Sequence, residues 1–372
     1  MSETKAVRIF ILGAGCSVKS GYPVGESLAS QLDGFYGQIP GDCTGIQKCV
    51  RSTLNLIIGR PAIETLDQLV QDLEDEFRNW SSQKGSATGV DKNYIDTETH
   101  TDDQIRDAKI ATTAMFVAKE DTTRQTGLPG YSRLVDSVFG GDPWEKAVSE
   151  SDCHVLSFNY DRLFEIAFLQ HFRVFDGQHI PLYEQTVLNS GFGQIKSDVY
   201  HKFQPKACRF SFLKLHGSAY WWVKRPKGAN GKNSLRHYWP TSPMKLADLH
   251  EIENVIQAEN DYPWEPLIVF PHEKHRGIAS PTEFEHDPYI RTVEGHAISV
   301  LKSATEVRII GYSFAPIDNR HVIDNLLSAI PDAAKIIVQN PSDSTVRARL
   351  EGYPTFRRRI ERGMVTFDPT PF

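Results

Sequence analysis

The chain has few cysteines, and none of them form the pairs that bind structural zinc. Of its 372 residues five are cysteines, and no two stand in a Cys-x-x-Cys pair. A zinc ribbon and a thioredoxin-type redox site both depend on such pairs, so the sequence encodes neither. The odd number and wide spacing of the five favour reduced thiols in a cytoplasmic protein. They are Cys16, Cys43, Cys49, Cys153 and Cys208.

Long apolar runs and an excess of positive charge are also lacking. The apolar stretch 7–12 is far too short to span a membrane, and no signal-peptide cleavage pattern follows it. A formal net charge of −6 argues against a protein that is basic throughout, so nucleic acid is not directly indicated. Six arginines near the C-terminus are interpreted as a solvated surface, with a patch for nucleic acid or an acidic partner as the alternative. They are Arg347, Arg349, Arg357, Arg358, Arg359 and Arg362.

What the sequence does contain is an alternation of strand and helix candidates. Short apolar runs typical of strands occur at six places, and apolar residues at helical spacing follow several of them. This alternation predicts an α/β fold, a Rossmann-like parallel sheet with helices on both faces. The predicted strands cover 8–12, 153–158, 210–215, 267–270, 306–310 and 335–339, with a hairpin over 220–233 and helices after Pro23 and at 318–330.

Residues 45–150 follow a different pattern. Apolar residues recur there at helical spacing, over 66–77 and again over 110–117, while 81–101 is polar and has no sustained apolar period. We interpret 45–150 as a helical insertion with one extended loop. The remaining ranges, 1–44 and 151–372, then form the main domain.

Polar or glycine-containing clusters follow five of the strand candidates. In open parallel sheets, ligands bind outside the carboxyl ends of the strands. The five clusters are therefore expected to line one crevice. They begin at Gly13, Asn159, His216, Gly311 and Asn340.

The first cluster, Gly13-Ala14-Gly15-Cys16-Ser17, suits a diphosphate. Glycines let a backbone approach phosphate oxygens, and the amides at a helix N-terminus donate to them. A dehydrogenase fingerprint would need a third glycine where Val18 stands and an acid at the end of the next strand, but Asp33 falls inside a predicted helix. A glycine turn without a ligand is the alternative.

Three side chains of the next two clusters suit catalysis, and each also has a structural explanation. Asn159 and Asp161 lie at a strand-to-helix junction, where either residue can cap a helix. His216 is a candidate general base, although a lone histidine at a strand end is usually structural. His272 and His275 have metal-like spacing, but no second ligand pair accompanies them, so no metal site is predicted.

Together these segments resemble the sirtuin-like superfamily, in their order as well as their motifs. Residues 13–23 look like its phosphate loop, Ser-Phe-Asn-Tyr-Asp at 157–161 resembles its asparagine motif, and Lys-Leu-His-Gly-Ser at 214–218 resembles the segment with the catalytic histidine. Gly-Tyr-Ser-Phe from 311, with Asp318 downstream, and Val-Gln-Asn-Pro ending at 341 resemble the segments that hold the distal nucleotide.

Two departures decide which activity the resemblance implies. Protein deacylases of this superfamily carry a four-cysteine zinc module that this chain lacks, and their phosphate loop continues into Asp-Phe-Arg where this chain has 24–26, Val-Gly-Glu. The zinc-free branch resembles NAD-depleting effectors of bacterial antiphage defence, which act as oligomers or with a HerA-type ATPase or a short Argonaute. The resemblance implies a NAD hydrolase without zinc, closest to the effector of the HerA-type ATPase. A protein deacylase and a non-catalytic NAD or ADP-ribose sensor are the alternatives.

The resemblance also implies roles for individual residues. Asn159 would position the ribose or the attacking water, His216 would be the general base, and Asp161 would orient the loop from behind. Other positions would bind the nucleotide. The residues expected to bind NAD are Gly13, Ala14, Gly15, Ser17, Pro23, Gly311, Ser313, Asp318 and Asn340.

Overall fold

The structure, a computed structural model, forms two compact units. The first comprises Met1–Ser20, Thr126–Gly217 and His286–Phe372, and the second comprises Gly21–Gln125 and Ser218–Glu285. The predicted insertion, 45–150, and the second unit overlap over 45–125, and the second unit also takes in 21–44 and 218–285. The described residues are 6–23, 25–83, 92–126, 128–141, 143, 146, 150–172, 210–224, 248–258, 264–268, 270, 288–314 and 325–372.

The first unit is built on a six-stranded sheet in which every described pairing is parallel. Its spatial order is β3-β2-β1-β6-β7-β8. Counted along the chain this is 3-2-1-4-5-6, the order of doubly wound dinucleotide-binding folds. The predicted Rossmann-like parallel sheet is therefore confirmed. The strands are β1 (Arg8–Leu12), β2 (Cys153–Ser157), β3 (Ser211–Lys214), β6 (Glu306–Ile310), β7 (Lys335–Gln339) and β8 (Val365–Asp368).

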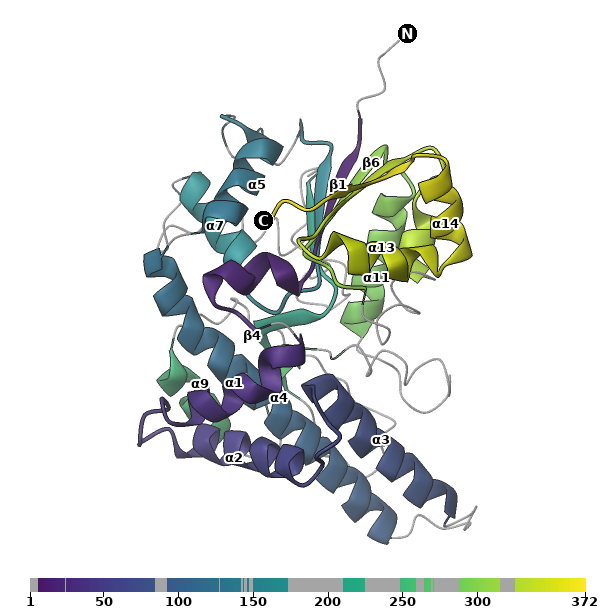
Figure 1. The fold of residues 1–372 in the computed structure, drawn as a ribbon. Coiled ribbons are helices and arrows are strands. Elements are labelled where there is room, and N and C mark those ends of the chain that lie inside the picture. Colours follow the sequence, from purple (N-terminus) through teal and green to yellow (C-terminus); the bar gives the residue numbers. More distant parts are fainter. Residues whose placement is uncertain are drawn as a thin grey trace. The chain divides into compact units, whose positions relative to one another are not determined.

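Helices cover both faces of this sheet (Figure 1). Strands buried on both faces read as continuous apolar runs, which is why the sequence revealed β1, β2 and β3. Because parallel crossovers are right-handed, the connections that lead towards β3 lie on one face and those that lead towards β8 lie on the other. The first face carries α5 (Pro129–Phe139) and α7 (Leu163–His171), and the second carries α11 (Pro288–Leu301), α13 (Asp343–Glu351) and α14 (Pro354–Glu361).

The strand register brings the carboxyl ends of the strands to one edge. Leu12 pairs with Ser157 on one side and with Ile310 on the other, and Ser157 in turn pairs with Lys214. The segments that follow β1, β2, β3, β6 and β7 therefore leave the sheet at the same edge, as the sequence analysis expected. The order of the sheet reverses between β1 and β6, which is where such folds hold their ligands.

The second unit is mainly helical. Its helix α2 packs against both α1 and α9, and α1 also contacts α3. A buried ion pair joins α4 to β5, with Lys109 Nζ 3.4 Å from Glu265 Oε1. The elements are α1 (Gly25–Tyr36), α2 (Thr44–Ile58), α3 (Leu66–Gln83), α4 (Lys92–Thr126), α9 (Leu249–Gln257) and the two-stranded sheet of β4 (Gly217–Lys224) and β5 (Trp264–Ile268).

Three sequence-based expectations change in detail. The loop predicted over 81–101 is wrong at both ends, because α3 continues to Gln83 and α4 begins at Lys92. A helix with little apolar content leaves no period for the sequence to reveal. The strand predicted at 267–270 begins earlier, as β5, and pairs with β4 outside the main sheet. The predicted hairpin loop and the predicted helix at 318–330 lie mostly outside the described residues. The described end of that helix range contains a short 3-10 helix, η5 (Leu327–Ala329).

Among the helices that the structure describes, none combines the length and the apolar character needed to cross a membrane.

A partly buried histidine of the main sheet makes the stability of the fold depend on pH. Burial, together with the nearby His296, lowers the pKa of His154, on β2, from 6.5 to about 4. The unfolded chain therefore binds a proton in a pH range where the folded chain does not. Between pH 6.5 and 4 we expect the free energy of unfolding to fall as pH falls, by up to about 1.4 kcal/mol per pH unit from this group. Above pH 6.5 the imidazole is neutral in both states, so this loss of stability is absent.

This dependence is measured by urea unfolding at a series of pH values, with His154→Leu as the comparison. The substituted chain should lose part of the acid sensitivity, because an apolar side chain takes no proton in either state. Equal acid sensitivity in the two proteins would contradict the assignment.

Candidate active site

Two glycine turns meet at the carboxyl edge of the sheet. The turn after β1 donates from Gly13 N to Ile310 O (2.9 Å) and from Gly15 N to Gly311 O (2.8 Å). A Cβ on Gly15 would lie 2.7 Å from Gly311 O, and a Cβ on Gly13 would lie 2.6 Å from the Cα of Tyr312. Gly311 also has a φ of +63°, which disfavours other residues. Close packing of the two turns therefore requires these glycines.

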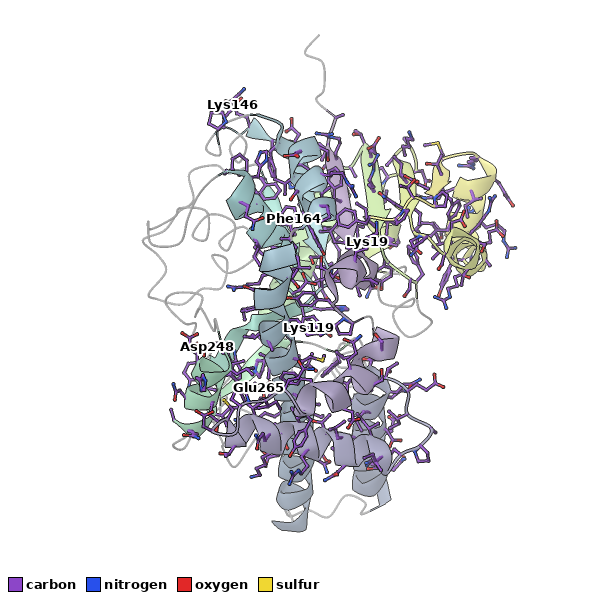
Figure 2. All side chains as sticks on the ribbon, turned by 60° about the vertical axis from the view of Figure 1, so that its left-hand side comes forward. Lys19, Lys119, Lys146, Phe164, Asp248 and Glu265 are labelled. Atoms are coloured by element: carbon purple, nitrogen blue, oxygen red, sulfur yellow. The ribbon has the colours of Figure 1, made fainter. Side chains whose placement is uncertain are left out.

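The same hydrogen bonds limit which amides of the first turn can bind a ligand. Those of Gly13 and Gly15 donate within the protein, and Cys16 N donates to Gly13 O (3.0 Å). A 3-10 helix, η1 (Ala14–Ser20), follows directly. Ala14 and Gly15 are exposed, so their backbone lies at the surface of the turn. Figure 2 labels Lys19 on this segment.

A chain of hydrogen bonds joins four buried polar side chains from three segments of the first unit. Ser17 Oγ lies 2.7 Å from Asp161 Oδ2 and 2.8 Å from the hydroxyl of Tyr131. Asn159 Nδ2 lies 3.1 Å from the same tyrosine hydroxyl and 3.3 Å from Ser17 Oγ. The segments are η1, the start of α5, and the loop between β2 and α7.

The carboxylate at one end sets the direction of every bond in this chain. Asp161 accepts from Ser17, which uses the only proton of that hydroxyl. Ser17 Oγ must then accept from the Tyr131 hydroxyl. The tyrosine oxygen in turn accepts from Asn159 Nδ2. The direction of the chain thus fixes the carboxamide of Asn159 with its nitrogen towards Tyr131 and its oxygen away.

That oxygen is the unusual atom of the cluster. Within the described residues, Asn159 Oδ1 is buried and has no hydrogen-bond partner. A buried acceptor without a donor costs about 1–3 kcal/mol, so its retention needs an explanation. An oriented, desolvated acceptor suits a hydroxyl group or water that a ligand brings to it.

Asp161 also has the structural role that the sequence allowed. Its Oδ1 accepts from the backbone N of Leu163 (3.0 Å), the first residue of α7. One carboxylate therefore caps the helix and ends the hydrogen-bond chain. The two interpretations of Asp161 are compatible.

His216 lies in the turn that follows the neighbouring strand, β3. It follows Lys214 by two residues as Asn159 follows Ser157, and Ser157 pairs with Lys214. His216 is buried, its ring lies 4.9 Å from that of Phe158 and 6.2 Å from that of Tyr160, and the next residue is Gly217, with a φ of +74°. The structure thus brings both predicted catalytic residues to the ends of adjacent strands.

A buried ion pair that the sequence did not predict contacts the loop between β2 and α7. Lys214 has no exposed surface, and its Nζ donates to the backbone carbonyl of Asp161 and, at 3.2 Å, to Glu165 Oε1. Burial raises the pKa of Glu165, and the positive charge of Lys214 opposes that rise. The one available signal was a lysine inside the apolar run Phe210–Leu215.

Tyr131 is the other functional candidate that sequence reasoning missed. Burial raises the pKa of its hydroxyl well above its usual range, with a further contribution from Asp161. The hydroxyl is therefore a neutral hydrogen-bonding group. Tyr131 lies within the range assigned to the helical insertion, and nothing in the local sequence links it to Asn159.

The remaining nucleotide-binding candidates have varied positions. Asn340 Nδ2 donates to Tyr312 O (3.0 Å) and its Oδ1 accepts from Ser342 N (2.9 Å), so its side chain holds two loops together. Ser313 is exposed, and its carbonyl accepts from Arg349 (2.6 Å). Pro23 belongs to the second unit, and Asp318 lies outside the described residues.

Comparison with known proteins gives a family match and similar solved structures. A family model described as a SIR2-like domain matches residues 154–355, more than half of the chain. One similar solved structure is Sir2 in complex with the inhibitor EX-527, 2'-O-acetyl-ADP-ribose and a deacetylated p53 peptide, with 11% identity, coverage of 96% of this chain and 94% of that chain, and a TM-score of 0.32. Another is Sir2Tm bound to a propionylated peptide, with 12% identity, coverage of 96% and 93%, and a TM-score of 0.34. No curated protein matches the chain.

Proposed function

The chain belongs to the SIR2-like domain family, and from that premise we propose that it binds NAD and hydrolyses the bond between nicotinamide and ribose. The matched region contains Asn159, Asp161 and His216. The observation that carries the proposal is the buried carboxamide oxygen of Asn159, held in place by a directed hydrogen-bond chain. We assign this oxygen the role of accepting from a ribose hydroxyl or from the attacking water.

The chemistry asks little of the protein beyond positioning. Nicotinamide is positively charged in NAD and leaves readily, so no strong general acid is needed. Loss of nicotinamide gives an oxocarbenium-like ribose, as in glycoside hydrolysis. The protein must orient the ribose and place the water. Asn159, with its orientation fixed, can do both without reorganising during the reaction.

His216 is assigned the role of general base. A neutral imidazole can remove a proton from a ribose hydroxyl or from water. The next residue, Gly217, has no side chain that could crowd the imidazole of His216. The rings of Phe158 and Tyr160 restrict the position of the imidazole.

The nucleotide-binding assignments follow from the same edge of the sheet. Ala14 and Gly15 are assigned to the diphosphate because they are the exposed residues of the first turn. Gly13 and Gly311 shape the two turns, and Ser17 acts through Asn159 instead of contacting phosphate. Ser313 is assigned to the adenosine side, where Asn340 holds the loop. Pro23 and Asp318 remain candidates from the motifs alone.

Water is the proposed acceptor because the sequence has no four-cysteine zinc module to complete an acyl-lysine tunnel. By the resemblance of its motifs, we assign the chain to the NAD-depleting effectors of antiphage defence. It would act in the cytoplasm as an oligomer, with a HerA-type ATPase as its partner. A protein deacylase and a sensor that binds NAD without cleaving it are the competing functions.

The proposal is tested by measuring nicotinamide release from NAD, with and without a HerA-type ATPase. Wild type should release nicotinamide in at least one of the two conditions, and His216→Ala should lose that activity. His171→Ala is the matched control. His171 is the last residue of α7, away from the carboxyl ends of the strands, and its Nδ1 lies 2.7 Å from Asp136 Oδ1. Equal turnover by the folded His216→Ala protein would refute the assignment of the base.

Tyr131→Phe predicts a smaller effect on the same reaction. The substitution removes only the hydroxyl that accepts from Asn159 Nδ2 and donates to Ser17. The carboxamide keeps its second acceptor, Ser17 Oγ, so its orientation is weakened and not lost. We expect kcat to fall about tenfold, the equivalent of one hydrogen bond, with little change in KM. Steady-state kinetics check this; an unchanged kcat would mean that the hydroxyl does not orient Asn159.

A further inference from the structure

A second cluster of reactive side chains lies in the helical unit. Asp42 and Cys43 end the connection between α1 and α2, and His250 lies in the first turn of α9. Their ligand atoms lie within 4.8 Å of one another. Cys43 is buried, whereas the side chains of His250 and Asp42 are 56% and 71% exposed. The cluster therefore combines a buried sulfur with two side chains that are exposed to solvent.

Two of the three separations between these atoms match edges of a tetrahedral metal site. His250 Nδ1 lies 3.6 Å from Cys43 Sγ and 3.5 Å from Asp42 Oδ2. Bond lengths of about 2.3 Å to sulfur and about 2.0–2.1 Å to nitrogen or oxygen give tetrahedral edges of about 3.6 Å and about 3.4 Å. Both separations are thus close to those of ligands that share a zinc ion.

The charges around the sulfur point in the same direction. The carboxylates of Asp42, Glu253 and Asp248 lie close enough to the Cys43 sulfur to act on it electrostatically. Their negative field favours a divalent cation beside that sulfur. Cys43 is also the residue before α2 and makes no capping hydrogen bond, so its sulfur is not committed to the helix.

The neighbouring carboxylates are already engaged. Glu253 accepts from the backbone N atoms of Gly45 (2.7 Å) and Ile46 (2.9 Å) at the start of α2. Asp248, labelled in Figure 2, accepts from the backbone N atoms of His250 and Glu251 at the start of α9. The bonds of Glu253 join α9 to the start of α2, and those of Asp248 cap α9. With both carboxylates engaged, water would be the fourth ligand of a tetrahedral ion.

We propose that Asp42, Cys43 and His250 form a site for a zinc-like divalent cation in the helical unit. One thiolate, one imidazole and one carboxylate suit zinc, which accepts sulfur, nitrogen and oxygen ligands in tetrahedral geometry. The ion would join the α1–α2 connection to α9, which are 207 residues apart in the chain. This site is independent of NAD cleavage, and it differs from a four-cysteine zinc module in having a single cysteine ligand.

Zinc content and cobalt absorption of the full-length chain test the proposal. After incubation with zinc and removal of free metal, wild type should retain about one zinc ion per chain. Asp42→Asn and His250→Ala should lose it, and both side chains are exposed, so neither substitution threatens folding. Cys49→Ala is the matched control, a second buried cysteine on α2 that lies outside the cluster, and it should retain the ion.

Cobalt provides a readout that identifies the sulfur ligand. Wild type loaded with cobalt should show a thiolate-to-metal charge-transfer band, which Cys43→Ser should remove and Cys49→Ala should keep. Chelation should lower the melting temperature of wild type but not of His250→Ala, since an ion that binds only the folded state stabilises it. Failure of wild type to retain zinc, or equal retention by Asp42→Asn and His250→Ala, would overturn the proposal. None of these measurements depends on turnover of NAD.

Discussion

Asn159→Ala is expected to lower the rate of nicotinamide release from NAD by about 100- to 1,000-fold, because a preorganised polar group at a reacting centre contributes that much. The side chain is buried, and its amide nitrogen bonds to Tyr131 and Ser17. Removing it deletes the one oriented acceptor of the cluster. Steady-state kinetics on wild type and variant measure the effect, with thermal unfolding to confirm that both are folded.

Two further variants sharpen this prediction. Asn159→Asp keeps the shape of the side chain but replaces the donor with a carboxylate oxygen near Asp161, so it should be as inactive as Asn159→Ala. Asn55→Ala removes an exposed asparagine of α2 and should leave turnover unchanged. Near-normal activity of folded Asn159→Ala would exclude Asn159 from the reaction and would leave its buried oxygen as a structural feature only.

Glu165→Leu is expected to destabilise the protein by about 3–5 kcal/mol, because it leaves a buried charge without its partner. Lys214 has no exposed surface, and its Nζ lies 3.2 Å from Glu165 Oε1. The double substitution Glu165→Leu and Lys214→Met should recover most of this loss, since neither charge remains. The shift of the urea midpoint, relative to wild type, measures both effects.

The opposite single substitution should depend on pH. In Lys214→Met the buried carboxyl of Glu165 loses the charge that opposes the rise of its pKa above the usual value of 4.5. Protonation of the Glu165 carboxyl then stabilises the folded state at pH values below its raised pKa. The variant loses this stability as the pH rises through that pKa. We expect Lys214→Met to be closest to wild type in acid.

For Glu165→Leu, a loss of stability no larger than that of an exposed ion pair, about 0–1 kcal/mol, would show that Lys214 reaches water.

The sequence was most informative where one physical rule dominates. Inner strands of a parallel sheet are buried on both faces, so β1 and β2 stand out as short apolar runs. Polar residues directly after such runs must share one edge of the sheet, and this placed Asn159 and His216 near each other. The first half of α4 is polar in sequence and gives no comparable pattern.

The rest of the site depends on contacts between distant segments. Tyr131 meets Asn159 across 28 residues and Ser17 across 114, and no local pattern encodes that meeting. Lys214 was visible as a lysine in an apolar run, but its partner Glu165 belongs to another element. Gly13 and Gly15 were assigned to a ligand, and the structure adds a second demand on them, the close approach of Gly311.

Mass spectrometry of NAD and its products decides whether the chain cleaves NAD with water as the acceptor. The chain is incubated with NAD and no peptide, alone and with a HerA-type ATPase. We expect NAD to disappear and nicotinamide and ADP-ribose to form in equal amounts. Nicotinamide release only after an acyl-lysine peptide is added would contradict it in favour of a deacylase. NAD that stays bound and intact in every condition would contradict it in favour of a sensor.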